Sequence, residues 1–313
     1  MVPGEVRGVV KAMPAFSQTL GRTPSSLYWK PPHSSPNRDL TPLTDWANLK
    51  LLKILPLLGI GLLALANAPR PAHDPGRLLV VLDPGHGGED DGAIGHDGLM
   101  EKNVALELAN TLARQLEAAG IEARLTRDGD TFIPLWDRAK IANAEGADLF
   151  ISLHLNAART RQAKGSEVYF LSMGAGDRFA AELAAVENAG GKHSAEQDPD
   201  SVVADILNDM SQKAFLQDSE RLAVAIQAQL NQLGGIKQRG VKQAPFVVLR
   251  GAAMPAVLVE TAFISNPREE AKLNDPLFRQ RVAQAITRGV RRFFAGGNGL
   301  SHRQSDPGPL GNH

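Results

Sequence analysis

The stretch LLVVLDPGHGGEDDGAIG, residues 78–95, decides the fold. It begins with an unbroken run of branched aliphatic residues, a composition typical of a strand buried on both faces. The run ends at Asp83-Pro84-Gly85, because proline and glycine interrupt regular structure. His86 follows directly, and the ligands of open α/β sheets lie just beyond the carboxyl ends of the strands. His86 is therefore either a metal ligand or catalytic base, or a structural histidine whose hydrogen bonds are satisfied internally.

Bulk composition narrows the chemistry that the chain can perform. It has 313 residues, a formal net charge of zero and no cysteine. A neutral chain lacks the basic face that nucleic-acid binding usually requires, so we expect no nucleic-acid partner. Without cysteine, neither a disulfide framework nor a thiolate metal site can form. A zinc ion would have to be held by imidazole and carboxylate groups, which are typical of catalytic sites.

The amino-terminal segment predicts export. Residues 1–48 are rich in proline, serine and threonine without sustained periodicity, so we expect a disordered extension. Residues 49–68 combine two lysines, an apolar run and a small-residue ending, which is a signal-peptide pattern. The run is short for a bilayer and contains Pro56, which argues against a stable membrane anchor. A buried core helix is the alternative, but nothing around the run could pack on it, and we expect a periplasmic protein.

Residues 69–76 are predicted to be a linker and residues 296–313 a disordered tail, so the folded unit is expected over residues 77–295. Short apolar stretches predict strands at 78–82, 121–126, 148–155, 166–171, 246–249 and 256–260. Amphipathic patterns predict helices over 101–119, 137–144, 177–188, 202–215, 219–233 and 275–293, with candidate caps at Asp137, Asp177 and Ser219. Because strands alternate with helices, we predict a single α/β domain with a mostly parallel sheet and helices on both faces.

Four ionisable side chains fall at the same end of this predicted sheet. His86, His154 and Glu260 lie at or near the carboxyl ends of strands, and Glu101 opens the helix after the His86 loop. Two histidines and a carboxylate form a zinc ligand set of hydrolases, and a further glutamate would be the expected general base. The spacing is irregular and holds no HExxH motif. For Glu101, the alternative is a helix-start glutamate that favours the helix dipole.

Four motifs together resemble one known family. LDPGHGGEDDGAIG, Glu101-Lys102-Asn103, SLHLNA and VETAFISN are similar to the zinc-dependent N-acetylmuramoyl-L-alanine amidases (Amidase_3) of the AmiA/AmiB/AmiC type. The resemblance runs from about residue 77 to 295 and implies a six-stranded α/β catalytic domain. It also implies Zn²⁺ on His86, Glu101 and His154, with Glu260 as the catalytic acid and base. The implied reaction is hydrolysis of the amide between N-acetylmuramic acid and L-alanine in peptidoglycan, for daughter-cell separation and wall remodelling.

The same resemblance implies a regulatory segment. In division-associated members, an inserted helix covers the cleft and its glutamate occupies the open position of the zinc ion. Activator proteins with a LytM domain, of the EnvC/NlpD type, displace that helix. Residues 177–216 are the candidate insertion here, and Glu187 is the candidate autoinhibitory glutamate. The alternative for Glu187 is an ordinary solvated residue of a helix.

Two rival functions remain open at this point. A zinc carboxypeptidase that acts on stem peptides needs a cation to hold the terminal carboxylate of its substrate, and Arg127 and Arg138 are available. An inactive wall-binding regulator on the same scaffold is the other rival. The presence of all four candidate site residues argues against it, because an inactive homologue would be free to lose them; they are His86, Glu101, His154 and Glu260.

Overall fold

The computed structural model describes residues 73–74, 76–172, 174–190 and 201–296, with only the backbone given for 201–214. The strands are β1 (Leu79–Pro84), β2 (Glu122–Leu125), β3 (Leu149–Asn156), β4 (Ser166–Leu171), β5 (Gln238–Ala244) and β6 (Ala256–Phe263). The helices are α2 (Glu101–Ala118), α3 (Leu135–Ala144), α4 (Arg178–Ala189), α5 (Ser201–Leu230), the 3₁₀ helix η1 (Val247–Leu249), α6 (Pro267–Leu273) and α7 (Pro276–Ala295).

Several predicted segments lie outside this part of the chain. The predicted extension (1–48), the signal peptide (49–68) and nearly all of the tail (296–313) are not among the described residues. The same holds for most of the predicted linker (69–76) and for residues 191–200 of the candidate insertion. Within the described ranges, no helix combines the length and hydropathy that crossing a bilayer would require.

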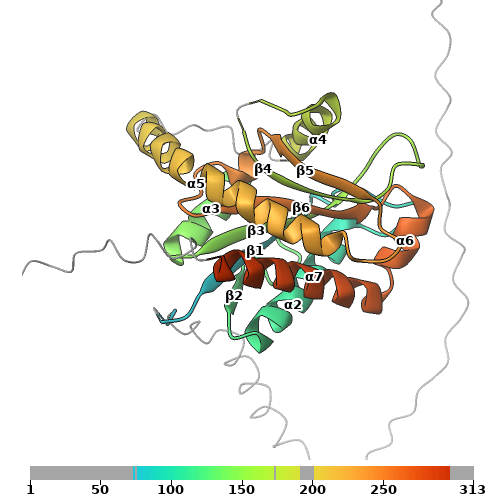
Figure 1. The fold of residues 1–313 in the computed structure, drawn as a ribbon. Coiled ribbons are helices and arrows are strands. Elements are labelled where there is room, and N and C mark those ends of the chain that lie inside the picture. The colour runs from blue at the N-terminus through green and yellow to red at the C-terminus, as the bar shows by residue number, and fades with distance from the viewer. Residues whose placement is uncertain (1–72, 75, 173, 191–200, 297–313) are drawn as a thin grey trace, which may run out of the picture. The chain divides into compact units, whose positions relative to one another are not determined.

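The strands form one six-stranded sheet in the order β2-β1-β3-β6-β4-β5 (Figure 1). Strands β2, β1, β3 and β6 pair in parallel, β4 is antiparallel to β6, and β5 is parallel to β4. The prediction of a mostly parallel sheet in an α/β domain is confirmed. Because β4 is reversed, its first residues lie at the same edge of the sheet as the last residues of β3 and β6.

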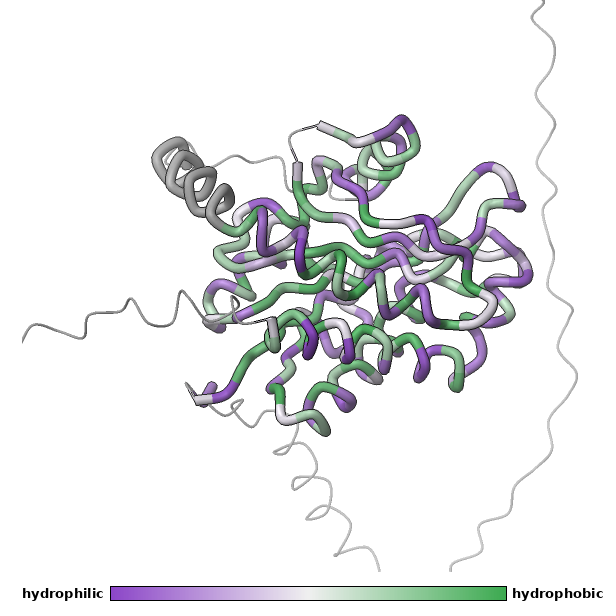
Figure 2. The backbone as a smooth tube through the Cα atoms, viewed as in Figure 1, coloured by the Kyte–Doolittle hydropathy of each residue, from purple (hydrophilic) through white to green (hydrophobic). Residues whose placement is uncertain are grey.

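One face of the sheet is covered by α2, α5 and α7 (Figure 1). In α2, Leu108, Leu112 and Leu116 recur every four residues and are buried against alternate strand residues such as Val80 and Leu82. Figure 2 shows the hydrophobic positions gathered in the central strands. This large apolar layer supplies a rigid support for the strands that carry the site.

The opposite face is covered by α3, α4 and η1. Strand residues Leu79, Val81, Phe150 and Leu258 pack there. Because strand side chains alternate between faces, the next residues of the same parity continue this face toward the carboxyl ends of the strands. Those next residues are polar, and they include the candidate site residues described below.

Two elements differ from the prediction at the β5 edge. The apolar segment 246–249 is predicted as a strand, but Val247–Leu249 forms η1. The edge strand is instead the preceding β5, whose sequence QRGVKQA has no run of apolar residues. Because β5 pairs only with β4, most of its positions are partly exposed and it needs no apolar pattern.

Two predicted helix starts were wrong. The helices predicted over 202–215 and 219–233 form the single helix α5, in which the hydroxyl of Ser219 donates to the carbonyl of Phe215 at 2.8 Å. Ser219 thus bonds back to its own helix and does not cap a new one. Helix α3 begins after Pro134, which places Asp137 inside the first turn. The predicted cap Asp177 is confirmed, since its carboxylate accepts from the amide of Ala180.

Candidate active site

The loop after β1 brings His86 into an unusual backbone conformation. Its φ of 58° is the one positive φ of a non-glycine residue in the described ranges. Such a conformation costs about 1–2 kcal/mol and persists only when its surroundings fix it. Gly85 is required by close approach, because a Cβ there would lie 2.5 Å from the imidazole of His154. The two candidate histidines can therefore lie together only with glycine between β1 and His86.

Two buried arginines hold this loop. Arg138 donates to the carbonyls of Pro84 and His86, both at 2.9 Å, and its charge is paired with Asp83 at 3.0 Å. Arg127 donates to the carbonyl of Pro84 at 3.0 Å and to that of Gly85 at 2.7 Å. Every guanidinium nitrogen of both arginines donates to a group of the protein. Neither arginine is therefore available to hold a substrate carboxylate.

The imidazole of His86 is oriented by Asp90. Its Nδ1 lies 2.9 Å from Oδ2 of Asp90, so Nε2 faces the interior. Carboxylates commonly orient metal-binding histidines in this way. Burial opposes the charged imidazolium, but the carboxylates of Glu101 and Asp90 outweigh that effect and hold the pKa of His86 well above its ordinary value. Asp90 was not predicted as a site residue from the sequence, although its position four residues after a loop histidine was a usable signal.

Glu101, the first residue of α2, is fixed by backbone donors. Its Oε2 accepts from the amide of Ala93 at 2.9 Å, and its Oε1 accepts from the amide of Leu155 at 2.8 Å. The side chain is almost fully buried. Burial raises its pKa, but the neighbouring His86 and His154 have the larger combined effect, so the pKa of Glu101 lies below its ordinary value. The carboxylate is therefore held ionised next to the two imidazoles.

His154 extends from β3 toward the same point. Its Nδ1 lies 3.3 Å from Oε1 of Glu101 and 3.1 Å from Oε2 of Glu187. Burial lowers its pKa, but the carboxylates of Glu187 and Glu101 raise the pKa of His154 to about 10. Carboxylate oxygens thus surround the imidazole, and they stabilise a positive charge at this point.

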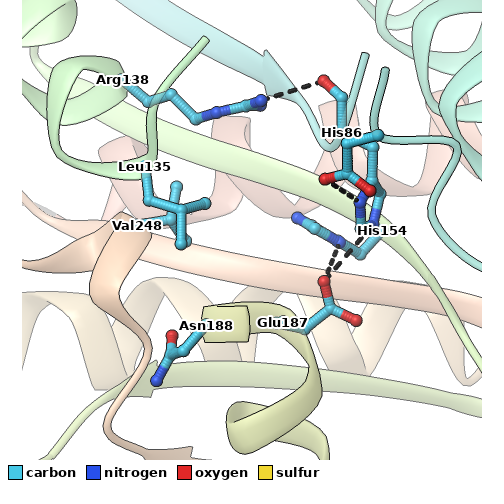
Figure 3. A pocket seen from close by; sticks show the side chains of 8 residues that line it. His86, Leu135, Arg138, His154, Glu187, Asn188 and Val248 are labelled. Atoms are coloured by element: carbon cyan, nitrogen blue, oxygen red, sulfur yellow. Dashed lines mark hydrogen bonds and ion pairs between the residues drawn. The ribbon is translucent and has the colours of Figure 1, made fainter. Parts of the chain in front are cut away.

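The structure brings His86, Glu101, His154 and Glu187 into one group whose donor atoms all lie within 4.8 Å of one another. Nε2 of His86, Nδ1 of His154 and Oε2 of Glu187 are buried without a hydrogen-bond partner, although they lie at ion-pair distances. Figure 3 shows His86, His154 and Glu187 converging at one end of a small pocket. Buried donors that face one another without bonding fit a shared cation, and imidazole with carboxylate is a donor set that zinc accepts.

Glu187 reaches this point from α4, near its carboxyl end. The next residue, Asn188, fixes the helix to the segment before η1, because its amide donates to the carbonyl of Pro245 at 2.9 Å and accepts from the amide of Val247 at 2.8 Å. The carboxylate of Glu187 itself contacts the two histidines. Its environment differs from the solvated helix position that was the alternative.

Glu260 lies beside this group on β6. In the sheet register it is the direct neighbour of His154 on β3 and of Glu167 on β4. Its side chain is fully buried, and within the described ranges neither carboxylate oxygen has a hydrogen-bond partner. Burial raises the pKa of Glu260 well above its ordinary value, and the nearby carboxylates of Glu187, Glu101 and Glu167 raise it further. Such a carboxylate is a good proton acceptor.

His154, Glu260 and Glu167 are direct neighbours across β3, β6 and β4. The sequence predicted the first two as site residues but not Glu167. Glu167 is fully buried, and it accepts from the hydroxyl of Tyr169 at 2.6 Å and from the side-chain amide of Asn156 at 3.1 Å. The available signal was a glutamate two residues before a tyrosine in a predicted strand, which places both on one face. Its significance depends on the register with β6, which the sequence does not specify.

Comparisons with known proteins agree with this geometry. Residues 80–292 match the Amidase_3 family, described as N-acetylmuramoyl-L-alanine amidase. The chain is 42% identical over 231 residues to N-acetylmuramoyl-L-alanine amidase AmiA of Escherichia coli strain K12, which covers 73% of this chain and 80% of that protein. It is 39% identical over 236 residues to AmiC of Neisseria meningitidis serogroup B, which covers 74% of this chain and 57% of that protein.

Solved structures show the same fold. AmiC2 of Nostoc punctiforme aligns with a TM-score of 0.52 at 32% identity, over 70% of this chain and 97% of that chain. An amidase from Clostridium difficile 630 aligns with a TM-score of 0.54 at 28% identity, over 71% of this chain and 98% of that chain. The CwlD amidase of Clostridioides difficile, solved in complex with the GerS lipoprotein, aligns with a TM-score of 0.53 at 23% identity, over 70% and 100% of the two chains, and shows likeness of fold.

Proposed function

Because this chain belongs to the N-acetylmuramoyl-L-alanine amidase family, we propose that it cleaves the amide between N-acetylmuramic acid and L-alanine at a zinc site formed by His86, Glu101 and His154. One observation carries the proposal. Two imidazole nitrogens and a carboxylate, from the loop after β1, from β3 and from α2, are buried together beside the carboxylate of Glu260, which has no hydrogen-bond partner among the described residues.

Each residue has a distinct role in this proposal. A bound zinc ion supplies Lewis acidity, which polarises the scissile carbonyl and acidifies water. Asp90 keeps Nε2 of His86 directed at the site, and the amides of Ala93 and Leu155 hold Glu101. These contacts fix the donors before any substrate arrives, so no reorganisation opposes the reaction.

Glu260 is the proposed acid and base. Its raised pKa favours acceptance of a proton from the attacking water, and the protonated carboxyl can then donate that proton to the departing nitrogen of L-alanine. The absence of any hydrogen-bond partner among the described residues leaves both oxygens available for this exchange.

We further propose that Glu187 autoinhibits the enzyme. Its carboxylate lies 3.3 Å from Nε2 of His86 and 3.1 Å from Nδ1 of His154, where it would occupy the coordination position that the substrate needs. Substrate hydrolysis then requires α4 to leave. A LytM-domain activator of the EnvC/NlpD type is the proposed partner that displaces it, with export to the periplasm and a role in daughter-cell separation and wall remodelling.

The carboxypeptidase alternative is weakened by the arginines. A peptidase of that type needs a free cation near the metal to bind the terminal carboxylate of its substrate. Arg127 and Arg138 instead hold the carbonyls of the His86 loop, and Arg138 is paired with Asp83. An endo-acting amidase has no such requirement.

Mass spectrometry of digested peptidoglycan tests the proposal. Purified sacculi would be incubated with the protein, with and without a LytM-domain activator. The expected products are free stem peptides and intact glycan strands. Shortened stems that remain attached to glycan would indicate a carboxypeptidase, and unchanged sacculi in the presence of activator would indicate an inactive regulator. Zinc removal by a chelator and its readdition is the matched control, because it should abolish and restore product formation.

A further inference from the structure

A second charged cluster lies on the sheet beyond Glu260, and the proposed chemistry does not use it. Buried Glu167 is paired with two cations from β5, Arg239 and Lys242, the latter at 3.1 Å. The same carboxylate already accepts from Tyr169 and Asn156. One carboxylate therefore faces two cations, and one positive charge is left in excess.

Helix α4 supplies the missing carboxylate. Asp177, its amino-terminal cap, places Oδ2 at 2.9 Å from Nζ of Lys242. The same helix covers Arg239, whose guanidinium lies 5.0 Å from the ring centroids of both Phe179 on α4 and Phe263 on β6. Departure of α4 would thus uncover two cations beside the aromatic ring of Phe263, with no carboxylate left to pair with the second cation.

Each end of α4 therefore places a carboxylate against side chains of the cleft. At one end Glu187 contacts the metal-binding histidines, and at the other end Asp177 pairs with Lys242. The residues are ten positions apart, which corresponds to about 15 Å along a helix. An extended peptide covers that length in about four residues. If α4 blocks the cleft by occupying the place of the substrate, its two carboxylates stand where the substrate has two electron-rich groups.

We propose that Lys242 and Arg239 form a second substrate site, which binds a carboxylate of the stem peptide about four residues from the scissile amide. This inference rests on the proposed function, because it assumes that α4 blocks the cleft. The reacting carbonyl lies at the histidines and the stem runs along the path of α4 toward β5. Lys242 is the specificity-determining residue, because it is the cation that pairs with Asp177 of α4 and would lose that carboxylate when α4 departs.

The test compares two substrates in a protein with both Glu187→Ala and Asp177→Asn, in which neither end of α4 places a carboxylate in the cleft. One substrate is a muropeptide with a four-residue stem, and the other is the same muropeptide with its stem carboxylates converted to amides. We expect kcat/KM to be about tenfold higher for the free carboxylate, as one charge-assisted contact allows. Adding Lys242→Gln should remove this preference through KM, and adding Lys242→Arg should retain it.

Controls separate this inference from the function on which it rests. Lys140→Gln, a change of charge at an exposed position of α3, should keep the preference. Binding of a soluble four-residue stem peptide, measured by calorimetry, should weaken about tenfold in Lys242→Gln. A preference that survives Lys242→Gln, or that is absent when Glu187→Ala and Asp177→Asn are combined, would overturn the second site. If Glu187→Ala were no more active than the unmodified protein, the autoinhibition proposal would fail, and the preference would then be measured in the unmodified protein.

Discussion

The three proposed metal ligands and Glu187 meet at one point but are held there by different means. His86 lies in the loop after β1, Glu101 begins α2 and His154 lies on β3. Buried arginines and backbone amides fix the His86 loop and Glu101. Glu187 belongs to α4, a 12-residue helix that joins the remainder through a small set of contacts, among them Asn188 and the Asp177–Lys242 pair.

We call the groups fixed to the core the permanent part of the site; they are His86, Glu101, His154 and Glu260. We call α4 with Glu187 the removable part. The permanent part is tied to the core, so its loss should affect folding, metal binding and turnover together. Under the proposed autoinhibition, the removable part would leave without unfolding the sheet, because few of its side chains are buried. Substitutions in the permanent part should therefore lower the activity, and substitutions in the removable part should raise it.

The largest expected effect is at Glu260, on the permanent side. Glu260→Gln keeps the size of the side chain but removes the proton acceptor, so turnover should fall by about 10²- to 10⁴-fold. Release of stem peptides from purified peptidoglycan measures the loss, and elemental analysis should show unchanged zinc content. Near-normal hydrolysis by this variant would refute the assignment of Glu260.

The next effect concerns the support of the His86 loop. Arg138→Met leaves Asp83 buried without its cation, and the free energy of unfolding should fall by about 3–5 kcal/mol. Urea unfolding followed by circular dichroism measures the change. The control is Lys140→Met on the same helix, where an exposed side chain should alter stability by less than about 0.5 kcal/mol. Equal effects of the two variants would show that the loop does not depend on Arg138.

Removal of Glu187 should give a gain of activity. Without its carboxylate, α4 no longer competes for the metal site, and basal activity without activator should rise about tenfold if the closed state is favoured by about 1.4 kcal/mol. Zinc content should stay the same. His86→Ala is the contrasting variant, since it should lose both zinc and turnover. Unchanged basal activity in Glu187→Ala would make Glu187 a simple helix residue.

The smallest effect is expected at Asn188. Asn188→Ala removes two hydrogen bonds that fix the end of α4, which weakens the closed state by about 1 kcal/mol and should raise basal activity about fivefold. Hydrogen exchange should increase in residues 178–189 and stay constant in β3. If exchange rose equally in both segments, α4 would be part of the permanent structure.

The sequence predicted best where one physical requirement acts alone. Strands β1, β3 and β6 are buried on both faces, so their apolar runs were sufficient. Strand β5 escaped prediction because an edge strand with Arg239 and Lys242 needs no apolar run. The run FVVL was mistaken for a strand, since its branched residues favour strands locally while the observed packing places them in η1.

The site residues, too, were predicted from the sequence only where a local pattern was sufficient. His86, His154 and Glu260 could be singled out because each follows or ends an apolar strand, and resemblance supplied Glu101 and Glu187. Asp90 and Glu167 were missed because their roles arise from contacts that depend on loop conformation and strand register. A sequence pattern gives the face of a strand but not its neighbour.

The bracing of the His86 loop has a consequence for how the protein acquires its metal. In small zinc domains the ion organises the chain, so chelation unfolds them. Here the guanidinium groups of Arg127 and Arg138 already impose the left-handed turn at His86, and Asp90 already selects its ring orientation. The coordination shell is preorganised, so capture of the ion should carry little ordering entropy, and a chelator should abolish activity while the metal-free protein stays folded with an unchanged circular dichroism spectrum.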